Sequence, residues 1–181
     1  MLTNGLNMAD SYILFVLRPW PGVEEKKAAM LKMAEYAQRQ YGLKPVFYAL
    51  EPRLDLDLAE ELANQFPGES HVIAAPNLGG VITGMMNKMK VVVSMRLHAL
   101  IFAAAGAAKM IGIVYDPKVS SFLDYMGQNR YCDLADVTQK TLQTLLDDAM
   151  QQAHATDGLG RLKALAQENA QVARRLLEEE T

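Results

Sequence analysis

Residues 91–115 have the sequence VVVSMRLHALIFAAAGAAKMIGIVY, in which two apolar runs flank a segment of helix length. Val91–Met95 and Met110–Tyr115 are continuous apolar runs, a pattern typical of strands that are buried on both faces. The segment between them, Leu97–Ala108, is predicted to be a helix. Two strands of one sheet joined by a helix lie parallel, with a right-handed crossover. This stretch therefore predicts one βαβ unit of a parallel sheet.

The same alternation of strand and helix continues on both sides of this unit. Further strands are expected at Tyr12–Leu17, Pro45–Leu50, His71–Ala75 and, more weakly, Tyr131–Leu134. Further helices are expected over the apolar stripe from Met30 to Tyr41 and at Leu56–Phe66, Val81–Met89 and Ser120–Met126. Strands that alternate with helices of this length form a parallel sheet with helices on both faces. The predicted fold is an α/β, Rossmann-like, doubly wound sheet.

The pattern changes after residue 135, where only helices are expected. We therefore predict a Rossmann-like domain over residues 1–135 and a helical extension over 136–181, which packs on the same domain or on a partner. In the last helix Leu162, Leu165, Asn169, Val172 and Leu176 follow a three-four spacing. That spacing fits either an ordinary amphipathic helix or a short coiled-coil seam, which would make a homodimer.

Composition excludes several classes of protein. The 181 residues are 50% hydrophobic and carry a formal charge of -3, so the chain can bury a core but has no basic excess for binding nucleic acid. The longest uncharged apolar run, Ala99–Ala108, is too short to cross a bilayer. The start of the chain lacks the layout of a secretory signal, and Cys132 is the single cysteine, so we expect no internal disulfide and a cytoplasmic location.

The candidate site residues follow the predicted strands, because ligands of open parallel sheets bind outside the carboxyl ends of the strands. The cations Arg18, Arg96 and Lys118, together with His98 and Tyr115, come at or just after strand ends. Other residues at such positions are Glu51, Arg53, Ser94 and Asp116. The helix that starts at Leu97 adds free backbone N–H groups and a partial positive charge. Together these groups predict a site for a small, doubly charged anion.

Structural alternatives remain open for several of these residues. Arg18 either binds an anion or packs its stem on Trp20, and His98 either contacts a ligand or makes structural hydrogen bonds. The loop that contains Gly79 and Gly80 lacks the spacing of a dinucleotide fingerprint. Neither His71 nor His154 has a partner at metal-ligand spacing, so no metal site is expected.

Two motifs resemble the polysaccharide pyruvyl transferase family, especially its CsaB-like branch. They are Ser94-Met-Arg-Leu-His-Ala-Leu-Ile-Phe-Ala-Ala104 and Gly112-Ile-Val-Tyr-Asp-Pro-Lys-Val119, and Leu17-Arg-Pro-Trp20 resembles the opening of that family's C-terminal domain. The resemblance implies the C-terminal half of a GT-B-like enzyme with two Rossmann-like domains. The implied reaction transfers a pyruvate ketal from phosphoenolpyruvate to a sugar of a cell-wall polysaccharide precursor. It implies no cofactor, and the isolated chain would need the N-terminal half for activity.

In terms of this resemblance, Arg18 and Arg96 would bind the phosphate and carboxylate of phosphoenolpyruvate, together with the Leu97 N–H. His98 would clamp the phosphate or deliver a proton, so His98 and Arg96 are the expected catalytic residues. Weaker substrate contacts are expected from Tyr115 and Lys118. Two alternatives remain open: a nucleotide-sugar-binding half of a GT-B glycosyltransferase, with Glu51 or Asp116 on the ribose, or a non-catalytic interaction module.

Overall fold

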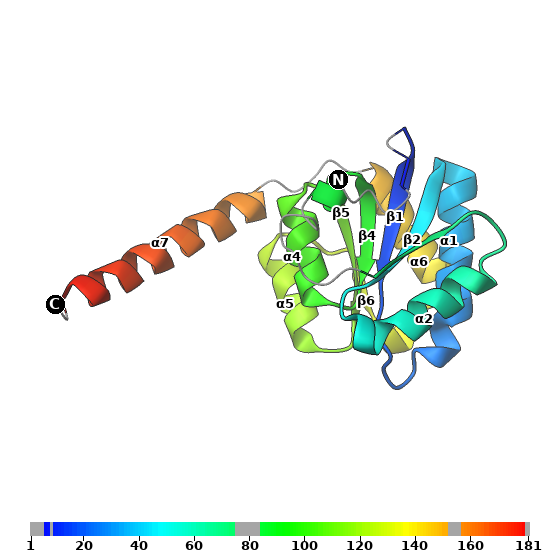
Figure 1. The fold of residues 1–181 in the computed structure, drawn as a ribbon, viewed down its shortest axis with the longest axis horizontal. Coiled ribbons are helices and arrows are strands. Elements are labelled where there is room, and N and C mark those ends of the chain that lie inside the picture. The colour runs from blue at the N-terminus through cyan, green and yellow to red at the C-terminus, as the bar shows by residue number, and fades with distance from the viewer. Residues whose placement is uncertain (1–5, 8, 75–83, 152–156, 180–181) are drawn as a thin grey trace.

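The computed structural model describes residues 6–7, 9–74, 84–151 and 157–179 of the chain. Its described strands form one six-stranded parallel sheet in the order β3-β2-β1-β4-β5-β6 (Figure 1). The strands are β1 (Ser11–Val16), β2 (Leu43–Ala49), β3 (His71–Ala74), β4 (Met89–Ser94), β5 (Lys109–Val114) and β6 (Tyr131–Asp133). This order is that of a Rossmann-like doubly wound sheet, so the predicted fold class is confirmed.

The central position of β1 explains its unbroken apolar sequence. It pairs with β2 on one side and β4 on the other, and every residue from Tyr12 to Leu17 is buried. Because successive side chains of a strand point to opposite faces, Ile13 and Phe15 enter one core while Tyr12 and Leu14 enter the other. A strand of this kind needs apolar residues at every position.

Helices cover both faces of the sheet. Figure 1 shows α1 (Lys27–Tyr41), α2 (Pro52–Gln65) and α6 (Gln139–Gln151) on one side, and α4 (Leu97–Ala105) and α5 (Pro117–Tyr125) on the other. Short 3-10 helices, η1 (Glu24–Lys26) and η2 (Leu134–Asp136), precede α1 and α6. The apolar stripes of these helices complete the two cores, as the sequence predicts for a two-sided sheet.

Local signals set the ends of several helices. Gly42 ends α1 with a left-handed φ of 66°, a conformation that glycine adopts without strain. α2 and α5 each begin at a proline, whose missing N–H is harmless in the first turn. The helix expected to reach Ala108 ends earlier, at Ala105, where a turn with Ala107 at φ 55° leads into β5.

The expected helix Val81–Met89 is wrong at its end. Residues 81–83 lie outside the described part of the chain, and the helical residues that follow are 84–86. Met89 belongs to β4, because its backbone pairs with Tyr12 of β1. Backbone pairing with the central strand thus decides the state of a residue that sequence periodicity had placed in a helix.

The two last helices differ in their surroundings. α6 packs on the sheet, with Leu142, Leu146 and Ala149 buried in the same core as α1 and α2. The last helix, α7 (Asp157–Glu179), projects away from the sheet, and Val172 on it is 47% exposed (Figure 1). The division into residues 1–135 and 136–181 stays a prediction, as does the partner of α7. No helix within the described ranges is long and apolar enough to cross a membrane.

Candidate functional site

The order of the strands identifies the edge at which a ligand is expected. β1 and β4 are neighbours, with β2 beyond β1 and β5 beyond β4. In doubly wound sheets this switch point, at the carboxyl ends of the strands, is where ligands bind. Arg18 follows β1 and Arg96 follows β4, so both arginines lie beside the switch point. Their side chains reach in opposite directions from it.

Arg96 already has carboxylate partners. Its Nη2 donates to Oδ1 of Asp55, and its Nη1 lies 3.6 Å from Oε2 of Glu51. Asp55 is 1% exposed, and its other oxygen accepts the backbone N–H of Glu51 at 3.0 Å. The backbone N–H of Arg96 donates to Oγ of Ser94 at 2.8 Å. The guanidinium is therefore fixed toward α2 and largely neutralised, a partnership that the sequence-based anion site did not include.

Arg18 is held on the other side of the switch point by aromatic residues. Its Nη1 donates to the hydroxyl of Tyr115 at 3.1 Å. Its guanidinium lies 5.1 Å from the ring centre of Trp20 and 5.4 Å from that of Tyr115, within cation–π range. Its Nε is buried and makes no hydrogen bond to the described residues. Arg18 therefore both packs on Trp20 and lies beside Tyr115, and it has no carboxylate partner among the described residues.

Two of the helices that start at this edge, α4 and α5, differ in the hydrogen bonds that their first N–H groups make. Asp116 caps α5 by accepting the backbone N–H of Lys118 at 3.0 Å. α4 has Arg96 at its N-cap, makes no side-chain capping bond and has no acidic residue in its first turn, where Leu97 and the exposed His98 lie. An uncapped helix start of this kind attracts anions, because its N–H groups and its dipole are uncompensated.

Tyr115, Asp116 and Lys118 form one cluster after β5. Nζ of Lys118 lies 3.0 Å from Oδ2 of Asp116 and 5.7 Å from the ring centre of Tyr115. Hydrogen bonds from the Lys118 backbone and side chain lower the pKa of Asp116, and the bond to Asp116 raises the pKa of Lys118. Both groups are therefore charged at neutral pH, and much of the Lys118 charge is taken up by Asp116.

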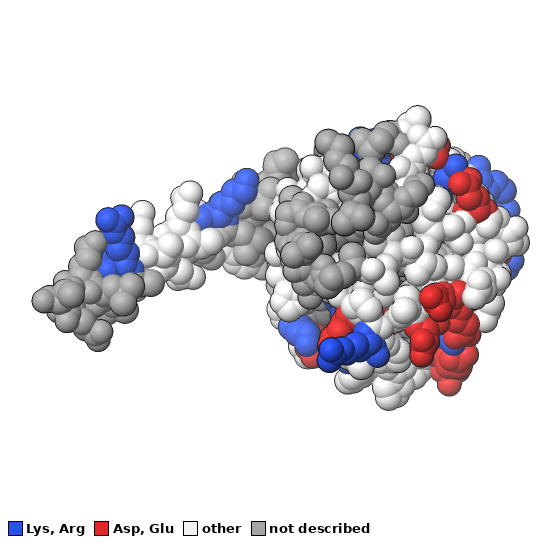
Figure 2. Space-filling view, viewed as in Figure 1, with Lys and Arg blue, Asp and Glu red and all other residues white. Residues whose placement is uncertain are grey.

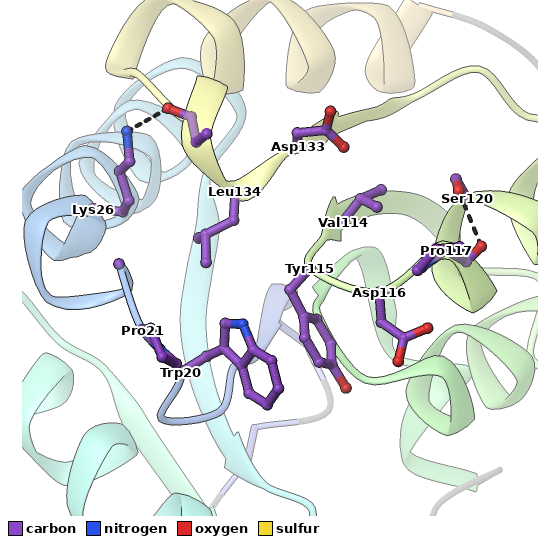
Figure 3. Close-up of a pocket in the computed structure, with 12 residues that line it drawn as sticks. Trp20, Pro21, Lys26, Val114, Tyr115, Asp116, Pro117, Ser120, Asp133 and Leu134 are labelled. Atoms are coloured by element: carbon purple, nitrogen blue, oxygen red, sulfur yellow. Dashed lines mark hydrogen bonds between the residues drawn. The ribbon is translucent and has the colours of Figure 1, made fainter.

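A pocket of about 560 Å³ opens beside this cluster, within the range typical of small-molecule sites (Figure 3). The pocket is lined by residues of the loop after β1, the segment after β5 and the end of β6, which include Trp20, Tyr115, Asp116, Ser120 and Asp133. Figure 2 shows acidic and basic side chains close together along the border where the strands end.

Sequence reasoning missed Asp55, Asp133 and Lys26, and it considered Trp20 only as a support for Arg18. The signal for Asp55 is its spacing on α2, where it shares the buried face with Leu58, Ala59 and Leu62. A carboxylate on the buried face of a helix requires a partner, which here is Arg96. The sequence carries no comparable signal for Asp133, because only the fold brings β6 beside β5.

The remaining candidates do not join this cluster. Arg53 is exposed at the start of α2, and the ring of His71 packs edge-on against Tyr12 at 5.8 Å. Burial raises the pKa of Cys132 to about 11, which agrees with a packing role for this thiol rather than a reactive one. The loop at residues 76–80 and His154 lie outside the described residues.

Comparisons with known proteins show that the fold of this chain is similar to part of several solved structures. Neither a model of a known family nor a curated protein matches the sequence. Among solved structures, the chain resembles a co-structure of S. aureus MnaA with UDP, at 10% identity and a TM-score of 0.61, with 81% of this chain and 40% of that chain covered. It also resembles UDP-GlcNAc 2-epimerase from Neisseria meningitidis bound to UDP-GlcNAc, at 12% identity and a TM-score of 0.60, with 91% and 46% covered.

A third similar structure is the glycotransferase of kitacinnamycin, at 13% identity and a TM-score of 0.58, with 90% of this chain and 41% of that chain covered. The chain therefore spans less than half the length of each of these proteins. At such low identity the likeness concerns the fold alone.

These findings contradict the resemblance to the polysaccharide pyruvyl transferases, because the similar structures are UDP-GlcNAc 2-epimerases and glycosyltransferases. Pyruvyl transfer and phosphoenolpyruvate are likewise unsupported. The motifs that carried the resemblance run from the last residue of β4 through most of α4, and from the second half of β5 into the start of α5. Arg96, the central residue of those motifs, is paired with Asp55. The likeness supports a Rossmann-like fold for this chain, similar to part of these epimerases and glycosyltransferases.

Proposed function

We propose that this chain is the nucleotide-sugar-binding half of a two-domain enzyme of the GT-B type, with the diphosphate of the ligand at the switch point between β1 and β4. The observation that carries the proposal is the asymmetry of that edge. α4 starts there without a capping side chain or an acidic residue, whereas the start of α5 is capped by Asp116. A diphosphate supplies the missing acceptors and the missing negative charge.

Arg18 supports the same position for the diphosphate. Its guanidinium is held by Tyr115 and Trp20 and has no carboxylate partner among the described residues, so its Nη groups keep donor capacity for a phosphate oxygen. Arg96 is a positioning residue in this proposal, because its charge is shared with Asp55 and Glu51. Among the similar structures, one was solved with UDP and another with UDP-GlcNAc, which favours a uridine nucleotide as the first ligand to test.

The reaction belongs to the whole enzyme in this proposal. The chain spans 40% of the length of S. aureus MnaA and 41% of that of the glycotransferase, so a second half would supply the other wall of the active site. Both an epimerase and a glycosyltransferase agree with a donor half of this kind. His98, exposed in the first turn of α4, remains a candidate contact to the diphosphate.

Calorimetric titration of this chain with UDP at low salt tests the proposal. Arg18→Ala removes a charge-assisted contact worth about 1.5–3 kcal/mol, so it should weaken UDP binding by about ten- to a hundred-fold. Arg39→Ala is the matched control, because Arg39 is an exposed arginine in the last turn of α1, which ends where β2 begins, at the opposite edge of the sheet. Absence of UDP binding, or equal binding by both variants, would reject the proposal.

A further inference from the structure

Trp20 is unusual for the single tryptophan of a chain with a large core. It is 43% exposed and lines the pocket beside β5, although large aromatic side chains are normally buried. Its ring contacts the ring of Tyr115 at 4.8 Å, and Arg18 lies 5.1 Å from its centre. Figure 3 shows Trp20 and Tyr115 projecting side by side from the loops that follow β1 and β5. The indole is therefore held in place while part of its surface faces the pocket.

The polar groups of the pocket disfavour a phosphate and favour hydroxyl groups. Asp116 and Asp133 both line it, and hydrogen bonds from Lys118 keep the pKa of Asp116 below its usual value, so that this carboxylate is charged. The lining lysine, Lys26, donates to the backbone carbonyls of Ala135 and Val137 at 2.6 and 3.1 Å. Carboxylates only accept hydrogen bonds, so they repel a phosphate and accept bonds from hydroxyl groups.

Ser120 adds to the acceptor character of the pocket. Its hydroxyl donates to the carbonyl of Pro117 at 3.0 Å, which leaves the lone pairs of its oxygen to accept a bond (Figure 3). The pocket thus combines an exposed aromatic face with several acceptors. The cationic group Arg18 and the uncapped start of α4 lie outside its lining, toward the switch point.

We propose that this pocket is a subsite for a sugar ring, with Trp20 as the platform against which the ring stacks and Asp116 and Asp133 as acceptors for its hydroxyl groups. This inference rests on the proposed function, since it assigns the sugar part of the nucleotide sugar to the pocket and the diphosphate to the switch point. The apolar face of a sugar ring matches the indole, and its hydroxyl groups match the carboxylates.

The single tryptophan provides a direct measurement. Fluorescence of the whole chain, excited at a wavelength specific for tryptophan, reports on Trp20 alone. Free N-acetylglucosamine should change this emission, and UDP-N-acetylglucosamine should change it beyond the change that UDP causes through Arg18, which lies 5.1 Å from the centre of the Trp20 ring. Equal responses to UDP and to UDP-N-acetylglucosamine, with no response to free N-acetylglucosamine, would overturn the inference.

Variants separate this inference from the proposed function. Trp20→Ala removes a support of Arg18 and can weaken both ligands, but it should weaken binding of UDP-N-acetylglucosamine by about tenfold more than binding of UDP in calorimetry, because an aromatic platform contributes about that factor. Trp20→Phe should restore part of the loss. Val172→Ala is the control, since Val172 is equally exposed but lies on α7, outside the pocket lining.

The possible failures are distinguishable. If UDP binds but Trp20→Ala weakens UDP and UDP-N-acetylglucosamine equally, or neither, the sugar subsite is wrong and the proposed function stands. If UDP does not bind at all, the proposed function is wrong. In that case a saturable fluorescence response to free N-acetylglucosamine that is lost in Asp133→Asn would still support the sugar subsite. If free N-acetylglucosamine gives no such response, the sugar subsite is rejected as well.

Discussion

Arg96 and Asp55 form an ion pair that is largely removed from water. The side chain of Asp55 is fully buried and that of Arg96 is 13% exposed. Such a pair is costly to bury, yet breaking it is more costly still, because one charge is left without a partner. The pair also links α2 to the start of α4, so it fixes the loop that carries the candidate diphosphate site.

Replacing one partner of this pair should therefore be destabilising. We expect Asp55→Ala to lower the free energy of unfolding by about 3 kcal/mol, the lower end of the usual range, because Arg96 retains some access to water. Urea denaturation measures the change. The double variant Asp55→Ala with Arg96→Met should recover part of the loss, and a larger loss in the double variant would contradict the ion-pair explanation.

Tyr41 makes a pH-dependent contribution to the stability of the folded state. Its hydroxyl donates to Asp147 at 2.7 Å, and burial together with this bond raises the pKa of Tyr41 from 10.0 to about 12. A phenol with a raised pKa favours the folded state in its protonated form. Its contribution is complete below pH 10 and is lost as the pH rises through about 12.

The Tyr41→Phe variant tests this contribution. It should lower the free energy of unfolding by about 1 kcal/mol at pH 8, the value of an ordinary hydrogen bond. The difference between variant and original chain should then shrink as the pH rises from 10 toward about 12. Urea denaturation at several pH values measures the difference, and a constant difference over this range would count against the assignment.

The helix α5 packs closely on β5 and β6 because residue 112 is a glycine. A Cβ atom at this position would lie 2.4 Å from Cδ1 of Leu123 on α5 and 3.1 Å from Cβ of Tyr131 on β6. Glycine is therefore required by space and not by backbone conformation. The contact brings α5 close to the sheet, and Asp116 and Ser120 of the pocket belong to this helix and its cap.

Gly112→Ala should be destabilising because overpacking of a core typically costs about 1–3 kcal/mol. For a chain of this size, that loss corresponds to a decrease in Tm of about 2–4 °C per kcal/mol, which calorimetry can measure. Leu123→Ala removes the neighbour but is itself destabilising, because Leu123 is fully buried. Gly112→Ala should therefore lower Tm less in the Leu123→Ala background than in the original chain, and an equal decrease in both would show that the close approach is not the cause.

The helices α6 and α7 make different contributions to the folded core of the molecule. α7 projects from the sheet (Figure 1), whereas α6 buries Leu142, Leu146 and Ala149 against it. The folded core within the described residues is thus made by segments that end with α6. Removing α7 should leave that core intact.

A chain that ends at residue 151 should therefore keep its cooperative thermal unfolding, with a Tm within a few degrees of the original. A chain that ends at residue 138 also loses α6 and should fail to unfold cooperatively, because it exposes the apolar face that α6 covers. Thermal denaturation followed by circular dichroism compares the two. A large decrease in Tm for the chain that ends at residue 151 would show that α7 supports the core.

The class of fold follows from the hydrophobic pattern of the amino-acid sequence. The unbroken apolar runs at β1, β4 and β5 can only be buried between two layers of helices, and the helical stripes between them supply those layers. The sequence also placed Arg18, Arg96 and Tyr115 after strands, because that position follows directly from where each strand ends. These properties are local, so periodicity and chain order are sufficient to predict them.

Only the tertiary structure decided which of these residues contact one another. Arg96 is directed to Asp55, and Arg18 to Tyr115 and Trp20, because the order of the strands brings α2 and β5 to opposite sides of the switch point. Strand ends and short motifs predicted that both arginines bind an anion, because such local patterns contain no information on partners distant in sequence. Side-chain partners are set by the packing of the whole sheet, which one segment of sequence does not encode.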